Sequence, residues 1–137
     1  KDAEIEVDRA IWGIKTAIQA IAGKQTRQVP MGLTESTENR MAWTLNEPLG
    51  LALGISAFNH PLNMIIHQVV PALAAGCPVL VKPSLKTPLS CLKFVELLYK
   101  SGTPQNYCQA IICKDVQIAQ LVANPKFKFI SFIGSRQ

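Results

Sequence analysis

Hydrophobic residues repeat with a helical period over the first 22 positions of the chain. Isoleucines stand at positions 5, 11, 14, 18 and 21, alanines at 10, 17, 20 and 22, and acidic residues come early. This spacing is typical of one apolar face of an α-helix, whose N-terminal end favours acidic side chains. Gly23 follows as a helix terminator. The pattern predicts a helix over residues 1–22.

Residues 23–46 lose this period. They contain Pro30, Gly32 and many Thr, Ser, Glu and Asn side chains, with short apolar runs at 29–31 and 41–45. Two extended segments joined by a turn fit this composition better than a helix does. Because so few of these residues can form a core, we expect the segment to pack on something outside the chain. This is a first indication of an oligomer.

From residue 47 onward, apolar runs typical of buried strands alternate with helical periods. One predicted helix has Thr87 as its N-cap, Pro88 as its first residue and Gly102 as its end. In the predicted helix before it, Pro71 is expected to cause a kink. The predicted strands are 51–57, 77–81, 107–113 and 127–133, and the other predicted helices are 62–75 and 115–123. This alternation predicts an α/β fold with βαβ units and an open, mainly parallel sheet.

Ligands of such sheets bind at the carboxyl ends of the strands. These ends fall at 58–61, 82–84, 113–115 and 134–135, and three of the four hold small or polar residues that can meet a phosphate or a sugar. The sequence contains no G-x-G-x-x-G, so the common dinucleotide fingerprint is absent.

Three side chains at these ends are candidates for chemistry. The amide of Asn59 can donate to a carbonyl oxygen that becomes an oxyanion, or it can cap the next helix or hold the Asn-His-Pro turn. Lys82 suits a ribose hydroxyl or a phosphate, or is a strand-end lysine with a buried stem. Gly134 and Ser135 can place a pyrophosphate at a helix N-terminus. We expect His67 to be a packed or partly exposed histidine rather than a general base.

Composition narrows the function classes. The chain has 137 residues with 14 Lys and Arg against 9 Asp and Glu, and its basic residues are scattered, which does not predict a nucleic-acid partner. The longest apolar stretch, 49–58, is too short to span a membrane. Four cysteines without a C-x-x-C or a nearby histidine predict free buried thiols in a reducing cytoplasm and no metal site. A start without Met and an end just after an apolar run lead us to expect a piece of a longer chain.

Five motifs, in order and at family spacing, closely resemble those of the NAD(P)-dependent aldehyde dehydrogenase superfamily. They are Asn46-Glu47-Pro48-Leu49-Gly50, Ile55–Asn63, Pro71–Ser84, Thr87-Pro88-Leu89 and Ser131–Ser135. The resemblance covers essentially the whole chain. It implies a Rossmann-like cofactor domain, of which 47–137 is the first part, preceded by an N-terminal helix at 1–22 and a two-stranded oligomerisation arm at 23–46. It also implies an aldehyde substrate and a homo-oligomer formed through the arm, whereas the absence of a nucleic-acid or membrane partner is expected from the composition alone.

The resemblance also implies roles for single residues. Asn59 matches the asparagine whose amide donates to the oxyanion of the thiohemiacetal. Lys82 and Ser84 match positions near the adenosine ribose. The remaining implied cofactor contacts are Ile55, Ser56, Ala57 and Phe58 along the groove, and Phe132, Gly134 and Ser135 on the adenine and pyrophosphate side.

Departures from the family pattern bear on cofactor and activity. Leu85 stands where many NAD-preferring relatives carry a glutamate, and Lys86 beside it can attract a 2′-phosphate, so the sequence leaves NAD and NADP both open. Ala57-Phe58 replaces the more common Pro-Trp and keeps an aromatic ring. None of the four cysteines matches the nucleophile, so we expect the nucleophilic cysteine and the general-base glutamate downstream of this segment. The segment alone is then inactive. The alternative is a non-catalytic, truncated relative that serves as a binding or assembly module.

Overall fold

The computed structural model describes residues 1–23 and 26–135. The parts of the predicted segments that fall on residues 24–25 and 136–137 lie outside this description. Helix α1 (Asp2–Ala22) begins and ends where the period predicts, and Gly23 follows it. The first predicted element is therefore confirmed.

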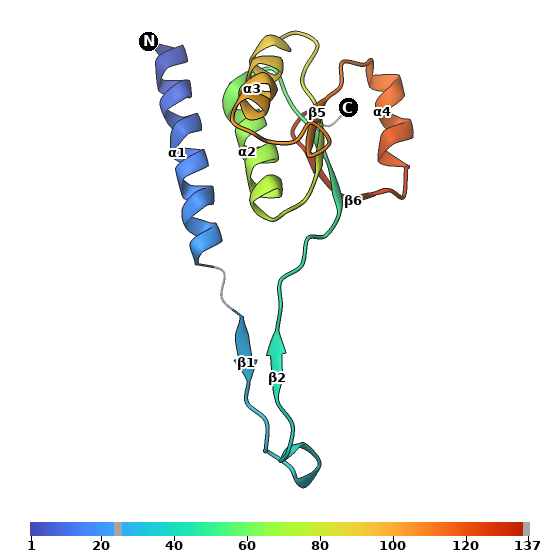
Figure 1. The fold of residues 1–137 in the computed structure, drawn as a ribbon. Helices are drawn as coiled ribbons and strands as arrows, with labels where there is room; N and C mark the ends of the chain where they lie inside the picture. The colour runs from blue at the N-terminus through green and yellow to red at the C-terminus, as the bar shows by residue number, and fades with distance from the viewer. Residues whose placement is uncertain (24–25, 136–137) are drawn as a thin grey trace.

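The polar segment after α1 forms a hairpin that extends away from the rest of the molecule (Figure 1). Strands β1 (Arg27–Val29) and β2 (Ala42–Thr44) pair antiparallel, with Gln28 opposite Trp43. A single 3-10 turn, η1 (Glu35–Thr37), lies between them in the chain. The two predicted extended segments are confirmed.

The remaining elements alternate between strand and helix, as predicted. They are β3 (Leu51–Ile55), α2 (Pro61–Ala74), β4 (Val79–Lys82), α3 (Leu89–Lys100), β5 (Cys108–Ala110), α4 (Asp115–Val122) and β6 (Phe127–Phe132). The four strands form one parallel sheet in the order β5-β4-β3-β6. β3 is therefore a central strand, and β6 is an outermost strand of the described sheet.

The core lies between the sheet and helices α2 and α3. Ile65, Ile66 and Val69 of α2 pack with Val81 of β4 and with the buried face of α3. Helix α1 lies on the outer side of α2, and α4 lies at the opposite side of the molecule next to β6 (Figure 1). No described helix is both long and apolar enough to cross a membrane.

The start of α3 and the bounds of the strands differ from the sequence-based expectation. Helix α3 begins at Leu89 with Pro88 as its N-cap, so the prediction that Thr87 caps it was wrong. Thr87 is instead part of a turn: its N–H donates to the Ser84 carbonyl at 3.1 Å, and its hydroxyl donates to the Phe58 carbonyl at 3.4 Å. Strand β5 is shorter than predicted because only Cys108–Ala110 pair with β4.

Helix α2 is followed by a glycine in the left-handed conformation, which ends the helix. The helix continues through Pro71 to Ala74, and Gly76 then adopts φ +77°. The Cys77 N–H donates to the Ala72 carbonyl and the Gly76 N–H to the Leu73 carbonyl, both at 2.9 Å. These two bonds form a Schellman motif, for which glycine is the favoured residue. The predicted helix end at Gly76 is confirmed.

Candidate functional site

The carboxyl ends of three neighbouring strands meet at one edge of the sheet. Ile55 of β3 is in register with Lys82 of β4 on one side and Phe132 of β6 on the other. Beyond the strands, the Ser56 N–H donates to the Lys82 carbonyl at 3.0 Å, and the Ile133 N–H donates to the Ile55 carbonyl at 2.9 Å. The structure therefore brings together the three strand ends that hold the predicted site residues.

The segment after β3 rises from the core to the surface over five residues. Ile55 and Ser56 are buried, Ala57 is half-buried, and Phe58 and Asn59 are exposed. The Ser56 hydroxyl oxygen is buried and has no hydrogen-bond partner among the described residues. The amide of Asn59 is therefore at the surface, next to the carboxyl ends of the strands. It follows a backbone segment that is hydrogen-bonded to β4 through Ser56.

A left-handed residue separates Asn59 from helix α2. His60 has φ 49° and ψ 58°, and it is the one described non-glycine residue with positive φ. This conformation costs an ordinary L-residue about 1–2 kcal/mol. It turns the chain sharply from the strand end into Pro61, the first residue of α2.

The cap of α2 comes from another helix. Oε1 of Glu6, in α1, accepts the Leu62 N–H at 2.8 Å and the Asn63 N–H at 3.0 Å. The alternative that Asn59 caps this helix is therefore wrong, because the carboxylate of Glu6 takes that place. Sequence reasoning missed Glu6, since an early acidic residue in a helix carries no signal of a partner that lies 56 positions away.

Lys82 is a buried lysine with an acidic partner. Its side chain is only 6% exposed, and its Nζ donates to Oδ1 of Asp115 at 2.7 Å. Asp115 begins α4 and is itself exposed. An ammonium has three N–H donors, so this pair leaves two for other acceptors. The interpretation as a strand-end lysine with only a buried stem is therefore incomplete, because the charged end is buried as well.

The turn after β4 places a cation over an aromatic ring from the β3 end. Ser84 Oγ accepts the Lys86 N–H at 3.3 Å, and Leu85 is exposed. Nζ of Lys86 lies 4.6 Å from the centroid of the Phe58 ring. This is the geometry of a cation–π contact. The sequence predicted both residues for the edge but not that they meet.

The β6 end contributes a second exposed ring and a close backbone approach. The Phe132 ring is 61% exposed, and it packs so tightly on Gly134 that a Cβ there would lie 2.6 Å from Cζ. Ser135 follows and is exposed. Any larger residue at position 134 must therefore displace the ring of Phe132.

The side chain of Gln68, in α2, links the ends of β3 and β6 by hydrogen bonds. Its Nε2 donates to the Ile55 carbonyl at 2.9 Å and to the Ser131 carbonyl at 3.0 Å. The side chain is buried, and its Cβ lies 3.5 Å from where a Cβ on Gly54 would stand, which is an ordinary van der Waals contact. Sequence reasoning missed Gln68, although a single amide within the apolar face of a predicted helix was an available signal.

His67 and the core cysteines Cys91 and Cys108 lie outside this constellation. All four cysteines are buried and free, as predicted. Burial, with a smaller contribution from Cys108, raises the pKa of Cys91 to about 12, and burial raises that of Cys108 to about 11, so both are neutral thiols near pH 7. His67 is exposed on α2. Among the described residues, no group of three His, Cys, Asp or Glu side chains is placed to hold a metal ion.

The whole sequence, residues 1–137, matches the family model described as "Aldehyde dehydrogenase family". The chain belongs to the aldehyde dehydrogenase family. The resemblance inferred from the motifs is thereby confirmed, as is the Rossmann-like α/β fold class.

Relatives within the family cover nearly all of this chain. It is 36% identical over 98% of its length to aspartate-semialdehyde dehydrogenase 1 of Pseudomonas canavaninivorans, and 32% identical over 98% to 3-sulfolactaldehyde dehydrogenase of Priestia aryabhattai. In both cases it spans 28% of the relative's length.

Solved structures of the family share the fold. The chain superposes with a TM-score of 0.90 on NADP-dependent glyceraldehyde-3-phosphate dehydrogenase of Bacillus halodurans complexed with NADP, at 30% identity, covering 96% of this chain and 28% of that one. Aldehyde dehydrogenase 21 of Physcomitrella patens, in complex with succinate, gives 0.90 at 28% identity, with the same coverage.

Proposed function

We propose that this chain is the last helix before the oligomerisation arm, the arm itself and the first part of the cofactor domain of a longer aldehyde dehydrogenase. That protein oxidises an aldehyde to a carboxylic acid with NAD or NADP. Residues 1–22, 23–46 and 47–137 are its three parts in this segment. The observation that carries the proposal is the meeting of the Asn59, Lys82 and Phe132 segments at one sheet edge, in a chain of this family.

The chemistry of this edge fits a dinucleotide. Ser56 offers a buried hydroxyl that has no hydrogen-bond partner in the described part of the chain, and the Lys82 ammonium has donors left beyond Asp115. Two exposed aromatic rings, Phe58 and Phe132, flank the edge. The residues that we propose to hold the cofactor are Ile55, Ser56, Ala57, Phe58, Lys82, Ser84, Phe132, Gly134 and Ser135. The bound nicotinamide supplies the hydride acceptor.

Asn59 is the catalytic residue that we assign to this chain. Its exposed amide donates an N–H to the aldehyde oxygen, where negative charge develops when a cysteine thiolate attacks the carbonyl carbon. We place the attacking cysteine in the rest of the protein, since all four cysteines of this chain are buried. We place the general-base glutamate that activates water for thioester hydrolysis there as well.

The turn after β4 bears on the choice of cofactor. Leu85 has no acceptor for ribose hydroxyls, and the Lys86 ammonium lies beside it over the Phe58 ring. A cation at this position is compatible with a 2′-phosphate, and the Bacillus halodurans relative was solved with NADP. Lys86 does not by itself disfavour NAD, so the proposal includes both cofactors.

The arm supports the homo-oligomer in this proposal. Its apolar side chains Leu33, Met41, Trp43 and Leu45 are all exposed in the single chain. Packing against a second copy would remove them from water. Free buried thiols support a reducing compartment, and we propose the cytoplasm.

The proposal is tested by steady-state kinetics of the complete protein with an Asn59→Ala substitution. We expect kcat to fall about 10²–10³-fold, as for the loss of one oxyanion donor, while the KM for NAD or NADP stays near that of the wild type. His67→Ala is the matched control, because His67 is exposed on α2 away from the strand ends, and it should retain full activity.

Two results contradict the proposal. An Asn59→Ala enzyme with unchanged kcat removes Asn59 from the chemistry. A complete protein that lacks both the downstream cysteine and the glutamate, and that oxidises no aldehyde, leaves the alternative of a binding or assembly module.

A further inference from the structure

We propose that Glu6 is a positioning residue for the reaction: from helix α1 it fixes the turn that presents Asn59. This inference rests on the proposed role of Asn59 as the oxyanion donor. It concerns a residue 53 positions before Asn59, in a helix that contributes nothing to the strand-end site itself.

Glu6 satisfies the free backbone donors at the start of α2. The first helical residue, Pro61, has no N–H, and the N-cap His60 makes no side-chain cap. The Met64 N–H already donates to the His60 carbonyl at 3.0 Å. The two N–H groups that remain in the first turn, those of Leu62 and Asn63, both donate to Oε1 of Glu6. A helix start normally takes such a cap from its own preceding residue.

Charge and burial strengthen this cap. A carboxylate at the N-terminus of a helix meets the positive end of the helix dipole, and hydrogen bonds to an ionised acceptor are stronger than neutral ones. Glu6 is half-buried between the two helices, so water screens the contact only in part.

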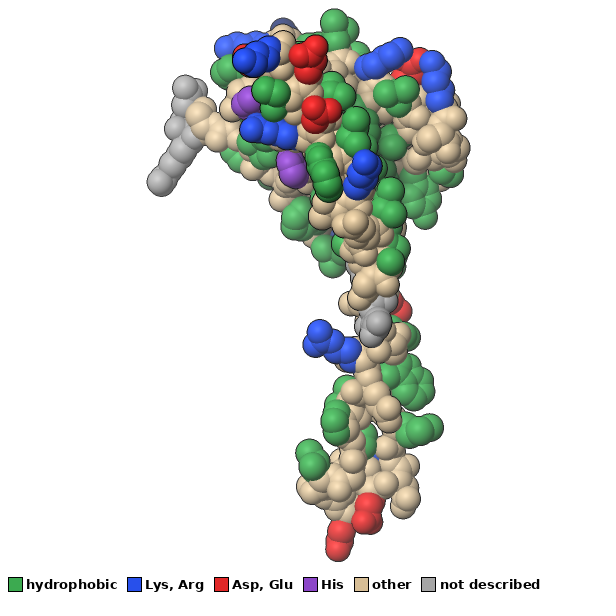
Figure 2. Space-filling view, turned by 90° about the vertical axis from the view of Figure 1, so that its left-hand side faces the viewer, with side chains coloured by type: hydrophobic (Ala, Val, Ile, Leu, Met, Phe, Trp, Pro, Cys, Tyr) green, Lys and Arg blue, Asp and Glu red, His purple; other side chains and the backbone are tan. Residues whose placement is uncertain are grey.

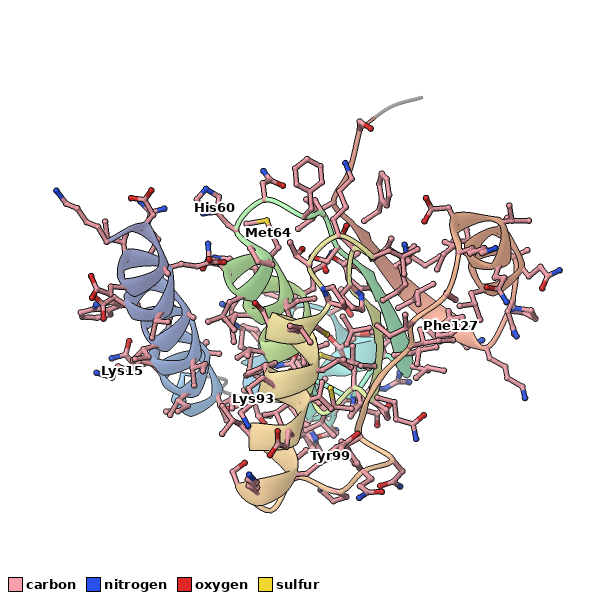
Figure 3. The ribbon with its side chains drawn as sticks, turned by 90° about the horizontal axis from the view of Figure 1, so that it is seen from above. Lys15, His60, Met64, Lys93, Tyr99 and Phe127 are labelled. Atoms are coloured by element: carbon pink, nitrogen blue, oxygen red, sulfur yellow. The ribbon has the colours of Figure 1, made fainter. Side chains whose placement is uncertain are left out.

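Helix α1 packs closely against α2, and this packing fixes the position of Glu6. Ala10, one turn beyond Glu6, is buried in the core cluster. At Gly13 the backbone of α1 comes so close that a Cβ would lie 3.0 Å from Cγ2 of Ile66. Figure 3 shows α1 running beside α2, with His60 and Met64 at the start of α2 on this side of the molecule.

The short segment between strand and helix is held from both ends. On the strand side, the backbone N–H of Ser56 donates to the Lys82 carbonyl, and the Thr87 hydroxyl donates to the Phe58 carbonyl. On the helix side, the Glu6 cap holds the first turn of α2. Only Asn59 and the left-handed His60 lie between these two anchors. Loss of the cap frees the helix side, so His60 relaxes and the Asn59 amide moves, while residues 55–58 keep their place.

The test is a double-mutant cycle in the complete protein with Glu6→Ala, Asn59→Ala and the two combined. We expect Glu6→Ala to lower kcat by about 10–100-fold, the size of effect that a small displacement of a catalytic group produces, with little change in the KM for NAD or NADP. If Glu6 acts through Asn59, the double variant is no slower than Asn59→Ala alone.

A second variant guards against a simple folding defect. Glu6→Gln keeps an oxygen that can accept both N–H groups but removes the charge, so it should recover most of the kcat lost in Glu6→Ala. Asp8→Ala removes the same charge from an exposed position on the same helix and should behave as the wild type.

The outcomes separate this inference from the proposed function. Losses that multiply in the double variant, or a Glu6→Ala enzyme that loses thermal stability but keeps its kcat, overturn the role of Glu6. If Asn59→Ala itself leaves kcat unchanged, the proposed function fails first, whatever Glu6 does.

Discussion

The body of the molecule, residues 47–135, and the arm, residues 26–46, use apolar side chains in opposite ways. In the body, Leu53, Val69 and Val81 are completely buried between paired strands and helices. In the arm, Leu33 is 87% and Met41 80% exposed. Figure 2 shows the arm as a narrow extension with hydrophobic side chains along it and acidic ones at its tip. The same kinds of residue therefore form a core in one region and an uncovered surface in the other.

The difference lies in the number of layers. The body stacks α2 and α3 on a four-stranded parallel sheet, and the apolar side chains between these layers are buried. The arm is two strands of three residues each with nothing stacked on either face. An isolated two-stranded hairpin is marginally stable in water. The arm is thus a segment whose stability depends on what it packs against, whereas the body carries its own core.

The largest effect expected from this comparison is on core stability. Ile66→Ala in the body should lower the free energy of unfolding of the 137-residue chain by about 3 kcal/mol, because it leaves a cavity between α2 and the sheet. Leu33→Ala in the arm should change it by less than about 0.5 kcal/mol. Urea denaturation of the dilute chain measures both. Equal losses would mean that the arm contributes to the same cooperative core.

A smaller effect on stability, but a clear one on assembly, is expected from the arm. Trp43→Ser in the complete protein should weaken self-association by about tenfold or more, because an exposed aromatic side chain of the arm is a candidate interface anchor. The unfolding of the body should be nearly unchanged. Sedimentation velocity over a concentration series measures the association.

Trp12→Ser is the matched control for this experiment. Trp12 is 67% exposed, against 58% for Trp43, but lies on α1, outside the arm, and its loss should leave the association as it is. Dissociation by Trp12→Ser and not by Trp43→Ser would place the interface on α1 instead.

Local patterns were sufficient to predict the elements of the fold. Each helix carries its own periodicity, each strand of the four-stranded sheet carries an apolar run, and the Gly76 terminator acts through hydrogen bonds within one turn of its helix. Thr87 misled because its sequence context, directly before Pro88, is that of an N-cap, whereas a carbonyl from the β3 end takes its hydroxyl. The end of β5 was misplaced because an apolar run does not reveal where the neighbouring strand stops pairing.

For the candidate site too, the sequence predicted the features that depend on local patterns. That Asn59 and Lys82 follow buried strands is a local property, and a parallel sheet brings such ends to one edge. The contacts that hold them are not local. Asp115 lies 33 positions from Lys82, and Glu6 lies 56 from Leu62. A single sequence gives no sign of these partners, because the packing of whole helices decides which side chains meet.

In the proposed function, the cofactor binds where the carboxyl ends of β3, β4 and β6 meet. A crystal structure of the complete protein with NADP or NAD bound tests it most directly. We expect the dinucleotide to contact residues 55–58, 82–84 and 132–135, with the Asn59 amide directed at the place where the aldehyde oxygen sits. A dinucleotide bound elsewhere, with these three segments free of contacts to it, would contradict the account.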